Sequence, residues 1–259
     1  MTTVRADLLE EGRVLRLVLD APRPNILSMQ MMSELREALA AHRDRRALRM
    51  VLLRGAGGTF SQGASVPEHK KEQAPAMLAA FSDLIRDVAT YPVPVAALVE
   101  GRCLGGAFEL VLACHLVFAT PGAVMGCPEV KLGVIPPVLA VLGHLRLGGA
   151  RAERMLLTGA DLDADAAFWS GLLAAIVPGE GDPEAWVMGW YRKSLAPLSA
   201  LTLREAVLAS RTASGILAAI HEPLQAAERR YVERLLPSRD ANEGIEAFLE
   251  KRPPHWVDA

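Results

Sequence analysis

Residues 99–120, VEGRCLGGAFELVLACHLVFAT, form the most informative stretch of the chain for its fold. An acidic residue, Glu109, stands in the middle of this stretch. In a helix that begins at Gly105-Gly106, the neighbours of Glu109 at three and four residues are all small or apolar. Burial of a carboxylate is costly unless it is paired or used, and it raises the pKa toward the range useful for proton transfer. Glu109 is therefore a candidate catalytic acid or base, with exposure on an amphipathic helix as the alternative.

The two glycines before Glu109 indicate a second feature of a site. The first amides of a helix have no partners within the helix, and they lie at the positive end of its dipole. Glycine also lets a ligand approach the backbone closely. An N–H group at Gly105 or Gly106 can therefore stabilise an enolate oxygen. Taken alone, a Gly-Gly pair before a helix is more often a sign of tight packing.

A second carboxylate of interest is Glu129, in the segment MGCPEVKLGVIPP of residues 125–137. It follows Pro128, directly after a predicted extended piece at Val124 and Met125. Such a loop can aim a carboxylate into a cleft. On residue context alone, an exposed loop acid is the simpler interpretation.

Other catalytic patterns are disfavoured. Ser65 and His69 stand close together, but GASVP is not the GxSxG nucleophile motif and no acid partner is evident. We expect His115 to be a satisfied core histidine and not a ligand. The sequence contains no HExxH, Walker or GxGxxG motif, which excludes the zincin, P-loop and simple dinucleotide sites. No metal is expected.

Outward from the central stretch, the pattern alternates between strands and helices. Strands are predicted at 14–19, 50–54, 92–101, 115–120, 124–125 and 172–177, and helices after Ser28, over 73–91, after Gly106 and through most of the chain beyond Pro137. This alternation predicts an α/β fold, although periodicity does not give the order of the strands. We expect an α/β core domain over residues 1–180, followed by a helical region over 181–259.

Composition limits the possible partners. The chain has 259 residues, 51% of them hydrophobic, and a net charge of −2, which indicates a globular protein without an electrostatic case for nucleic acid or an anionic membrane. Every apolar stretch is interrupted well short of the roughly 20 residues that a membrane span needs. The three cysteines have no CxxC spacing, which predicts buried free thiols and a reducing compartment. A cytoplasmic, oligomeric protein is expected.

Three motifs in order resemble the crotonase (enoyl-CoA hydratase/isomerase) superfamily. They are FSQGAS at 60–65, the central stretch at 99–120, and MGCPEVKLGVIP at 125–136; EGIEAFLEKRPPHW at 243–256 resembles the family's C-terminal motif. The resemblance implies repeated ββα units in two roughly perpendicular sheets, followed by a C-terminal helical trimerisation region. It also implies a homo-oligomer, either a trimer or a dimer of trimers.

The resemblance assigns roles to individual residues. The backbone N–H groups of Ala64 and Gly106 match the oxyanion hole for a thioester carbonyl, and Glu109 and Glu129 match the two glutamates of the hydratases. The implied partner is an acyl-CoA thioester, so coenzyme A is part of the substrate and no separate cofactor is expected. Residues matched to substrate binding are Ser65, Val66, Gly105, Pro136, Phe248 and Lys251, of which the last two lie where the family contacts the coenzyme A nucleotide.

Two glutamates favour hydration over isomerisation, because isomerases of this superfamily usually need one acid. Departures from the family pattern are Ser65, Ala107, His115 and the apolar segment PPVLAVLGHL at 136–145. This combination resembles the cyclohexa-1,5-diene-1-carbonyl-CoA hydratases, and an apolar wall suits a flat carbocycle. The product would be 6-hydroxycyclohex-1-ene-1-carbonyl-CoA.

Three alternatives stay open at this point. The first is a straight-chain enoyl-CoA hydratase or isomerase. The second is a dehydratase or decarboxylase that acts on a carrier-protein thioester. The third is a non-catalytic binding protein, against which the presence of both glutamates argues.

Overall fold

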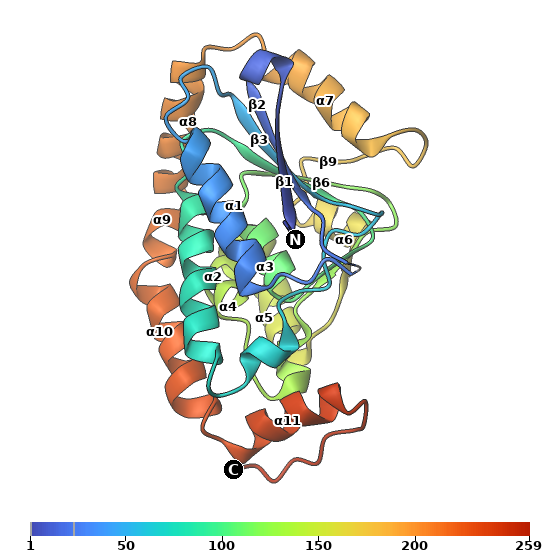
Figure 1. The fold of residues 1–259 in the computed structure, drawn as a ribbon, viewed down its shortest axis with the longest axis vertical. Coiled ribbons are helices and arrows are strands. Elements are labelled where there is room, and N and C mark those ends of the chain that lie inside the picture. The colour runs from blue at the N-terminus through green and yellow to red at the C-terminus, as the bar shows by residue number, and fades with distance from the viewer. Residues whose placement is uncertain (1, 23) are drawn as a thin grey trace.

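The computed structural model describes residues 2–22 and 24–259, which form two β-sheets surrounded by helices (Figure 1). The strands are β1 Val4–Leu9, β2 Val14–Leu19, β3 Met50–Gly55, β4 Val95–Val99, β5 Arg102–Leu104, β6 Leu116–Ala119, β7 Val124–Gly126, β8 Leu162–Asp163 and β9 Ala175–Ile176. The larger sheet has the order β1-β2-β3-β4-β6-β9, and the smaller has the order β5-β7-β8. The α/β fold with two sheets is confirmed.

Parallel pairing dominates the larger sheet. Strands β2, β3, β4, β6 and β9 run parallel, and β1 adds to the edge as the antiparallel partner of β2. The short strands β5 and β8 were not predicted, because three and two residues are too few to show a period. Strand β1 was also missed, since exposed Ala6 and Leu8 and partly buried Asp7 leave no apolar alternation in VRADLL.

The helices connect and cover these strands. They are α1 Met29–His42, α2 Ala74–Ala89, α3 Gly106–Ala113, α4 Pro137–Leu147, α5 Gly149–Thr158, α6 Ala164–Trp169, α7 Pro183–Ser194, α8 Ala200–Ala213, α9 Ile216–Ala219, α10 Glu222–Arg230 and α11 Arg239–Leu249. Short 3-10 turns lie at η1 Glu10–Gly12, η2 Val66–His69 and η3 Pro128–Leu132, and a π-helical turn, η4, spans Tyr231–Leu235. As predicted, Ser28 caps α1 by accepting a hydrogen bond from the amide of Met31 at 3.3 Å.

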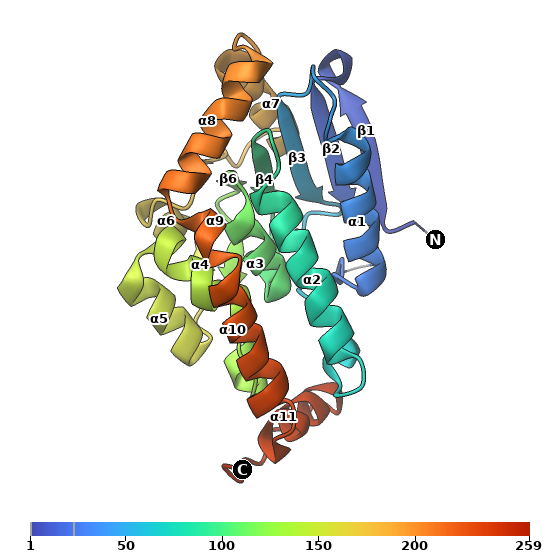
Figure 2. The same ribbon diagram turned by 90° about the vertical axis from the view of Figure 1, so that its left-hand side faces the viewer.

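Both faces of the larger sheet are buried, which explains why its strands read as nearly continuous apolar runs. On one face, α1, α2 and α3 lie side by side over the sheet and form the main core (Figure 2). On the other face, α7 packs its side chains against Val14, Met50 and Phe118. Trp186 and Trp190 of α7 contact the Phe118 ring edge-on, with centroid distances of 6.1 and 5.1 Å.

The remaining C-terminal helices follow a different path from α7. Helix α10 packs along α4, and α11 packs against η2 and η3 (Figures 1 and 2). The region after residue 180 therefore covers both the sheet and the segments that carry Glu129 and His69. The division into 1–180 and 181–259 stays a prediction.

The sequence made predictions about the three cysteines and about His115. Cys103, Cys114 and Cys127 are buried free thiols, as expected. His115 is only partly satisfied: its Nδ1 accepts from the amide of Val95 at 3.1 Å, whereas its buried Nε2 has no partner in the described chain. Across residues 2–22 and 24–259, none of the helices combines the length and apolar character that a membrane span requires.

We expect Phe118→Ala to lower the free energy of unfolding by about 3–5 kcal/mol, because it leaves a cavity between α7 and the sheet. Phe168→Ala is the matched control, since 42% of Phe168 is exposed and the same change there should cost about 0.5 kcal/mol. Urea unfolding followed by circular dichroism measures both values. Equal losses for the two variants would contradict this account of the packing.

Candidate active site

Glu109 lies in the first turn of α3, a helix in which every residue is buried. Its amide donates to the carbonyl of Gly105 at 3.0 Å, which fixes the start of the helix. Only 3% of Glu109 is exposed. The alternative of a solvent-exposed position on an amphipathic helix is therefore wrong.

The first amides of α4 hold the Glu109 carboxylate. The N–H groups of Val138 and Leu139 donate to its Oε1 at 2.7 and 3.0 Å. Pro137 occupies the first position of α4, where a missing N–H costs nothing. Burial raises the pKa of Glu109 to about 7 against the lowering effect of these two hydrogen bonds, and the charge of Glu228 raises it further. The carboxylate is thus fixed in place and able to exchange a proton near neutral pH.

Glu129 lies in the 3-10 turn η3 after Pro128 and is also buried, with 8% of its surface exposed. Burial raises its pKa well above the ordinary value, and the charge of Glu109 raises it further. Its Oε1 lies 2.8 Å from the point where a Cβ of residue 105 would stand. Gly105 has a φ of 55°, so glycine is required there both for the backbone and for the approach of this carboxylate.

The two carboxylates therefore form a coupled pair around Gly105. Two buried like charges do not both ionise easily, so one carboxyl keeps its proton over a range of pH in which the other is ionised. Glu109 is the one stabilised by two amide hydrogen bonds, and it ionises first. The pair can therefore supply one base and one acid.

Backbone pairing brings together Ala64 and Gly106, the two residues that are predicted to form the oxyanion hole. The amide of Ser61 donates to the carbonyl of Arg102 at 3.0 Å, and the amide of Leu104 donates back to Ser61 at 3.1 Å. This pairing places Ala64 against the start of α3, where its Cβ lies 3.5 Å from the point at which a Cβ of Gly106 would stand. Within the described chain, neither the Ala64 nor the Gly106 amide donates to another backbone group. The two residues are thus adjacent, and their role as an oxyanion hole stays a prediction.

The other matched residues occupy two places. Ser65 and Val66 begin η2 beside Ala64 and are partly buried, and Pro136 precedes α4 and is buried. Phe248 and Lys251 lie at the exposed end of α11, with 54% of Phe248 accessible. Their contact with a coenzyme A nucleotide stays a prediction.

Sequence reasoning missed three contributions to the site. The segment after Pro136 was expected only as an apolar wall, yet its amides bind Glu109. Glu228 and Tyr231 reach the same region from the C-terminal part of the chain, since the charge of Glu228 acts on Glu109 and both glutamates of the pair act on Tyr231. Their three-residue spacing on one helical face was the only sequence signal available.

One alternative for the site, a Ser65 nucleophile with His69 as its base, can be set aside. His69 donates from Nδ1 to the carbonyl oxygen of Ser65 at 2.9 Å, and this bond does not activate the Ser65 hydroxyl. Among the described residues, no group of three or more His, Cys, Asp or Glu side chains could hold a metal ion.

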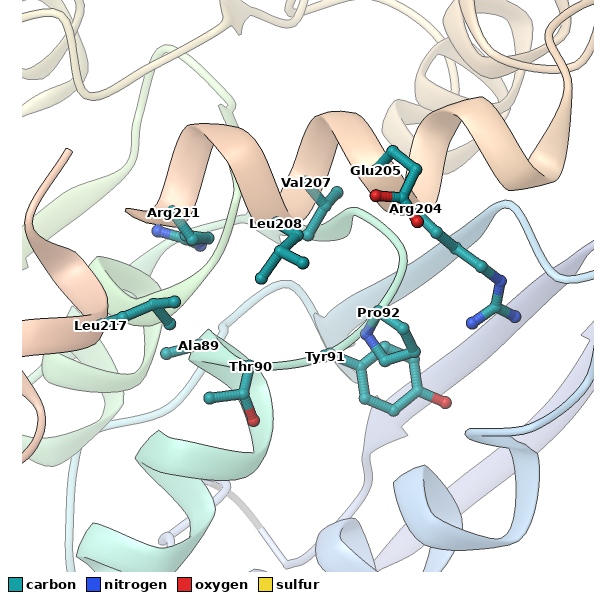
Figure 3. A pocket seen from close by; sticks show the side chains of 10 residues that line it. All are labelled: Ala89, Thr90, Tyr91, Pro92, Arg204, Glu205, Val207, Leu208, Arg211 and Leu217. Atoms are coloured by element: carbon teal, nitrogen blue, oxygen red, sulfur yellow. The ribbon is translucent and has the colours of Figure 1, made fainter. Parts of the chain in front are cut away.

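A separate cavity of about 350 Å³ lies between the end of α2 and α8 (Figure 3). Its walls include Tyr91, Pro92 and Leu208, with Arg211 at one end. Neither glutamate lines it, so it is distinct from the carboxylate pair.

Comparisons with known proteins agree on one family. The sequence profile described as enoyl-CoA hydratase/isomerase matches residues 10–259. A relative named cyclohexa-1,5-dienecarbonyl-CoA hydratase, from Thauera aromatica, is 41% identical over 246 residues, which cover 95% of this chain and 93% of the relative. A probable mitochondrial enoyl-CoA hydratase from Dictyostelium discoideum is 32% identical over 95% of this chain and 88% of its own length.

Solved structures give the same result. The crystal structure of an enoyl-CoA hydratase from Mycobacterium avium subsp. paratuberculosis K-10 superimposes with a TM-score of 0.86 at 27% identity. The match covers 99% of each chain. The similarity therefore extends over the whole fold, including the C-terminal helices.

The raised pKa of Glu109 predicts a particular dependence of stability on pH. Because the folded-state pKa of about 7 lies above the ordinary 4.5, the stabilising contribution is fully present below about pH 4.5 and is lost as the pH rises through 7. Glu109→Gln removes this dependence. We therefore compare the unfolding free energy of the variant with that of wild type at each pH. From pH 5 to pH 8, this difference should shift by on the order of 2 kcal/mol in favour of the variant.

Urea unfolding at the two pH values measures this gain. Glu205→Gln, at an exposed position of α8, controls for the loss of one carboxylate elsewhere in the chain. A constant difference between Glu109→Gln and wild type at both pH values would show that the Glu109 pKa is not raised.

Proposed function

The chain belongs to the enoyl-CoA hydratase/isomerase family, and on that premise we propose that it is an acyl-CoA hydratase whose substrate is cyclohexa-1,5-diene-1-carbonyl-CoA. The observation that carries the proposal is the buried pair of Glu109 and Glu129, in which burial raises the pKa of both carboxyls. Hydration needs both functions at once, because one group takes a proton from water and another gives a proton to carbon.

The geometry supports a division of roles. Glu109 acts as the base toward water, because it ionises first and its Oε1 is fixed by the Val138 and Leu139 amides. Glu129 acts as the acid, because burial and the charge of Glu109 both favour its protonated form. The Ala64 and Gly106 amides donate to the thioester oxygen, where negative charge develops.

In the proposed reaction, the water oxygen bonds to the β-carbon of the dienoyl thioester while its proton passes to Glu109. The electrons of the broken π-bond form a thiodienolate, whose oxygen the two amides hold. Glu129 then gives its proton to the far end of the diene, and the carbonyl re-forms. The product is 6-hydroxycyclohex-1-ene-1-carbonyl-CoA. Because Glu109 has gained one proton and Glu129 has lost one, the total charge of the pair is unchanged.

Two observations support a cyclic substrate. The relative from Thauera aromatica, 41% identical over most of its length, carries the name of this activity. The start of α4 beside Glu109 is apolar and buried, with Pro136, Val138 and Leu139 next to one another. Such a wall favours a flat hydrocarbon ring over a polar group.

The expected assembly is a homo-oligomer, a trimer or a dimer of trimers. Helix α8 supports this proposal, because it exposes 69% of Leu201 and 55% of Leu208. Apolar side chains grouped on one helix are typical of subunit interfaces. Phe248 and Lys251 are proposed to contact the coenzyme A nucleotide.

We expect Glu109→Gln and Glu129→Gln each to lower kcat for hydration by at least about 100-fold, since each removes one proton-transfer group. Thioester hydration is followed by chromatography of the acyl-CoA products, and Glu205→Gln serves as the control. Turnover of cyclohexa-1,5-diene-1-carbonyl-CoA should exceed that of crotonyl-CoA. A preference for crotonyl-CoA would contradict the substrate assignment, and unchanged rates in both variants would contradict the catalytic one.

The pair also predicts a bell-shaped pH profile of kcat/KM. Activity should rise as the pH passes through about 7, where Glu109 becomes ionised, and should fall at higher pH when Glu129 loses its proton. Initial rates between pH 5 and pH 10 give the profile, with spontaneous thioester hydrolysis subtracted. A rate that falls as the pH passes through 7 would exclude Glu109 as the base.

A further inference from the structure

Tyr231 stands where α10 passes into the π-helical turn η4. Such turns are rare, and they occur frequently at functional sites. Only 1% of Tyr231 is exposed, and within the described chain its hydroxyl has no hydrogen-bond partner. A buried phenol usually finds a partner, since an unsatisfied polar group costs about 1–3 kcal/mol. Its hydroxyl is therefore suited to a ligand group that enters the site.

The surroundings of Tyr231 belong to the candidate active site. The His69 ring, on the turn that follows Ala64, lies 6.5 Å from the Tyr231 ring between centroids. Burial raises the pKa of the phenol, and the charges of Glu129 and then Glu109 raise it further. The hydroxyl thus lies in the electric field of both carboxylates, and it stays protonated throughout the working range of pH.

Glu129 offers a matching group in the same site. Its Oε1 approaches Gly105, whereas its Oε2 is buried without a hydrogen-bond partner in the described chain. A phenol donor and a carboxyl oxygen are thus both unpaired in one site. An oxygen that carries a hydrogen atom can satisfy both, because it accepts from Tyr231 and donates to Glu129.

We propose that Tyr231 is a further catalytic residue, whose hydroxyl donates a hydrogen bond to the water oxygen that adds to the substrate and to the resulting product hydroxyl. The proposal rests on the proposed hydration. As Glu109 takes the proton of this water, its oxygen gains negative charge, and a fixed donor stabilises that charge. Tyr231 transfers no proton itself, because its phenol is held protonated.

Tyr231→Phe tests the proposal, and Tyr191→Phe is its matched control. Tyr191 is also fully buried with an unpaired hydroxyl in the described chain, but it lies on α7 against the opposite face of the larger sheet. We expect Tyr231→Phe to lower kcat about 10- to 100-fold with little change in KM, as for the loss of a hydrogen bond to a charged group. Tyr191→Phe should leave both constants unchanged.

Binding of two coenzyme A thioesters separates a catalytic role from a packing role. By calorimetry, Tyr231→Phe should weaken binding of 6-hydroxycyclohex-1-ene-1-carbonyl-CoA about tenfold and leave binding of cyclohex-1-ene-1-carbonyl-CoA, which lacks the hydroxyl, unchanged. The ratio of the two dissociation constants does not depend on the fraction of protein that is folded. It therefore stays informative even if the variant is less stable.

Three results would overturn the proposal. If Tyr231→Phe has the kcat of wild type while Glu109→Gln and Glu129→Gln are inactive, Tyr231 has no catalytic role, and the proposed hydration still stands. Equal weakening for both thioesters would assign Tyr231 to packing alone. If wild type and both glutamate variants hydrate nothing, the proposed hydration fails, and the role of Tyr231 fails with it.

Discussion

The site depends on one electrostatic constraint, which is that two carboxylates are buried close to each other. Glu109 and Glu129 are both removed from water, and each raises the cost of ionising the other. Sharing a single proton relieves that cost and leaves one acid and one base. The pair is therefore costly to bury, and the proposed chemistry rests on it.

Much of the surrounding fold serves to hold this pair. Helix α3 carries Glu109 through the core, and the first amides of α4 bind its carboxylate. A glycine at 105 leaves room for Glu129. Helix α11 packs closely against the turn that bears Glu129, since a Cβ added at Gly244 would collide with the carbonyl oxygen of Leu132. Segments far apart in the sequence thus meet at one point, which is why the C-terminal helices belong to the site.

The sequence predicted the elements whose patterns are local. The apolar runs of β2 and β3, the Ser28 cap and the start of α3 at Gly106 all depend on neighbouring residues, and they were correct. The burial of Glu109 was also predictable, because its helical neighbours are apolar. The contributions of the α4 amides and of Tyr231 were not predictable. These groups are 29 or more residues away from Glu109 in the sequence, and periodicity carries no information about contacts at that separation. Glu129 needed the family motifs, since a loop acid has no pattern of its own.

The most direct test of the central claim is to observe the carboxyl groups themselves. Carbon-13 NMR of protein labelled at the glutamate carboxyls, assigned with the Glu109→Gln and Glu129→Gln variants, follows each group as the pH changes. The account predicts that Glu109 ionises at a lower pH than Glu129, and that in Glu109→Gln the Glu129 pKa falls toward the ordinary range. If both carboxyls ionise near pH 4.5, independently of each other, the buried pair does not share a proton and the account is contradicted.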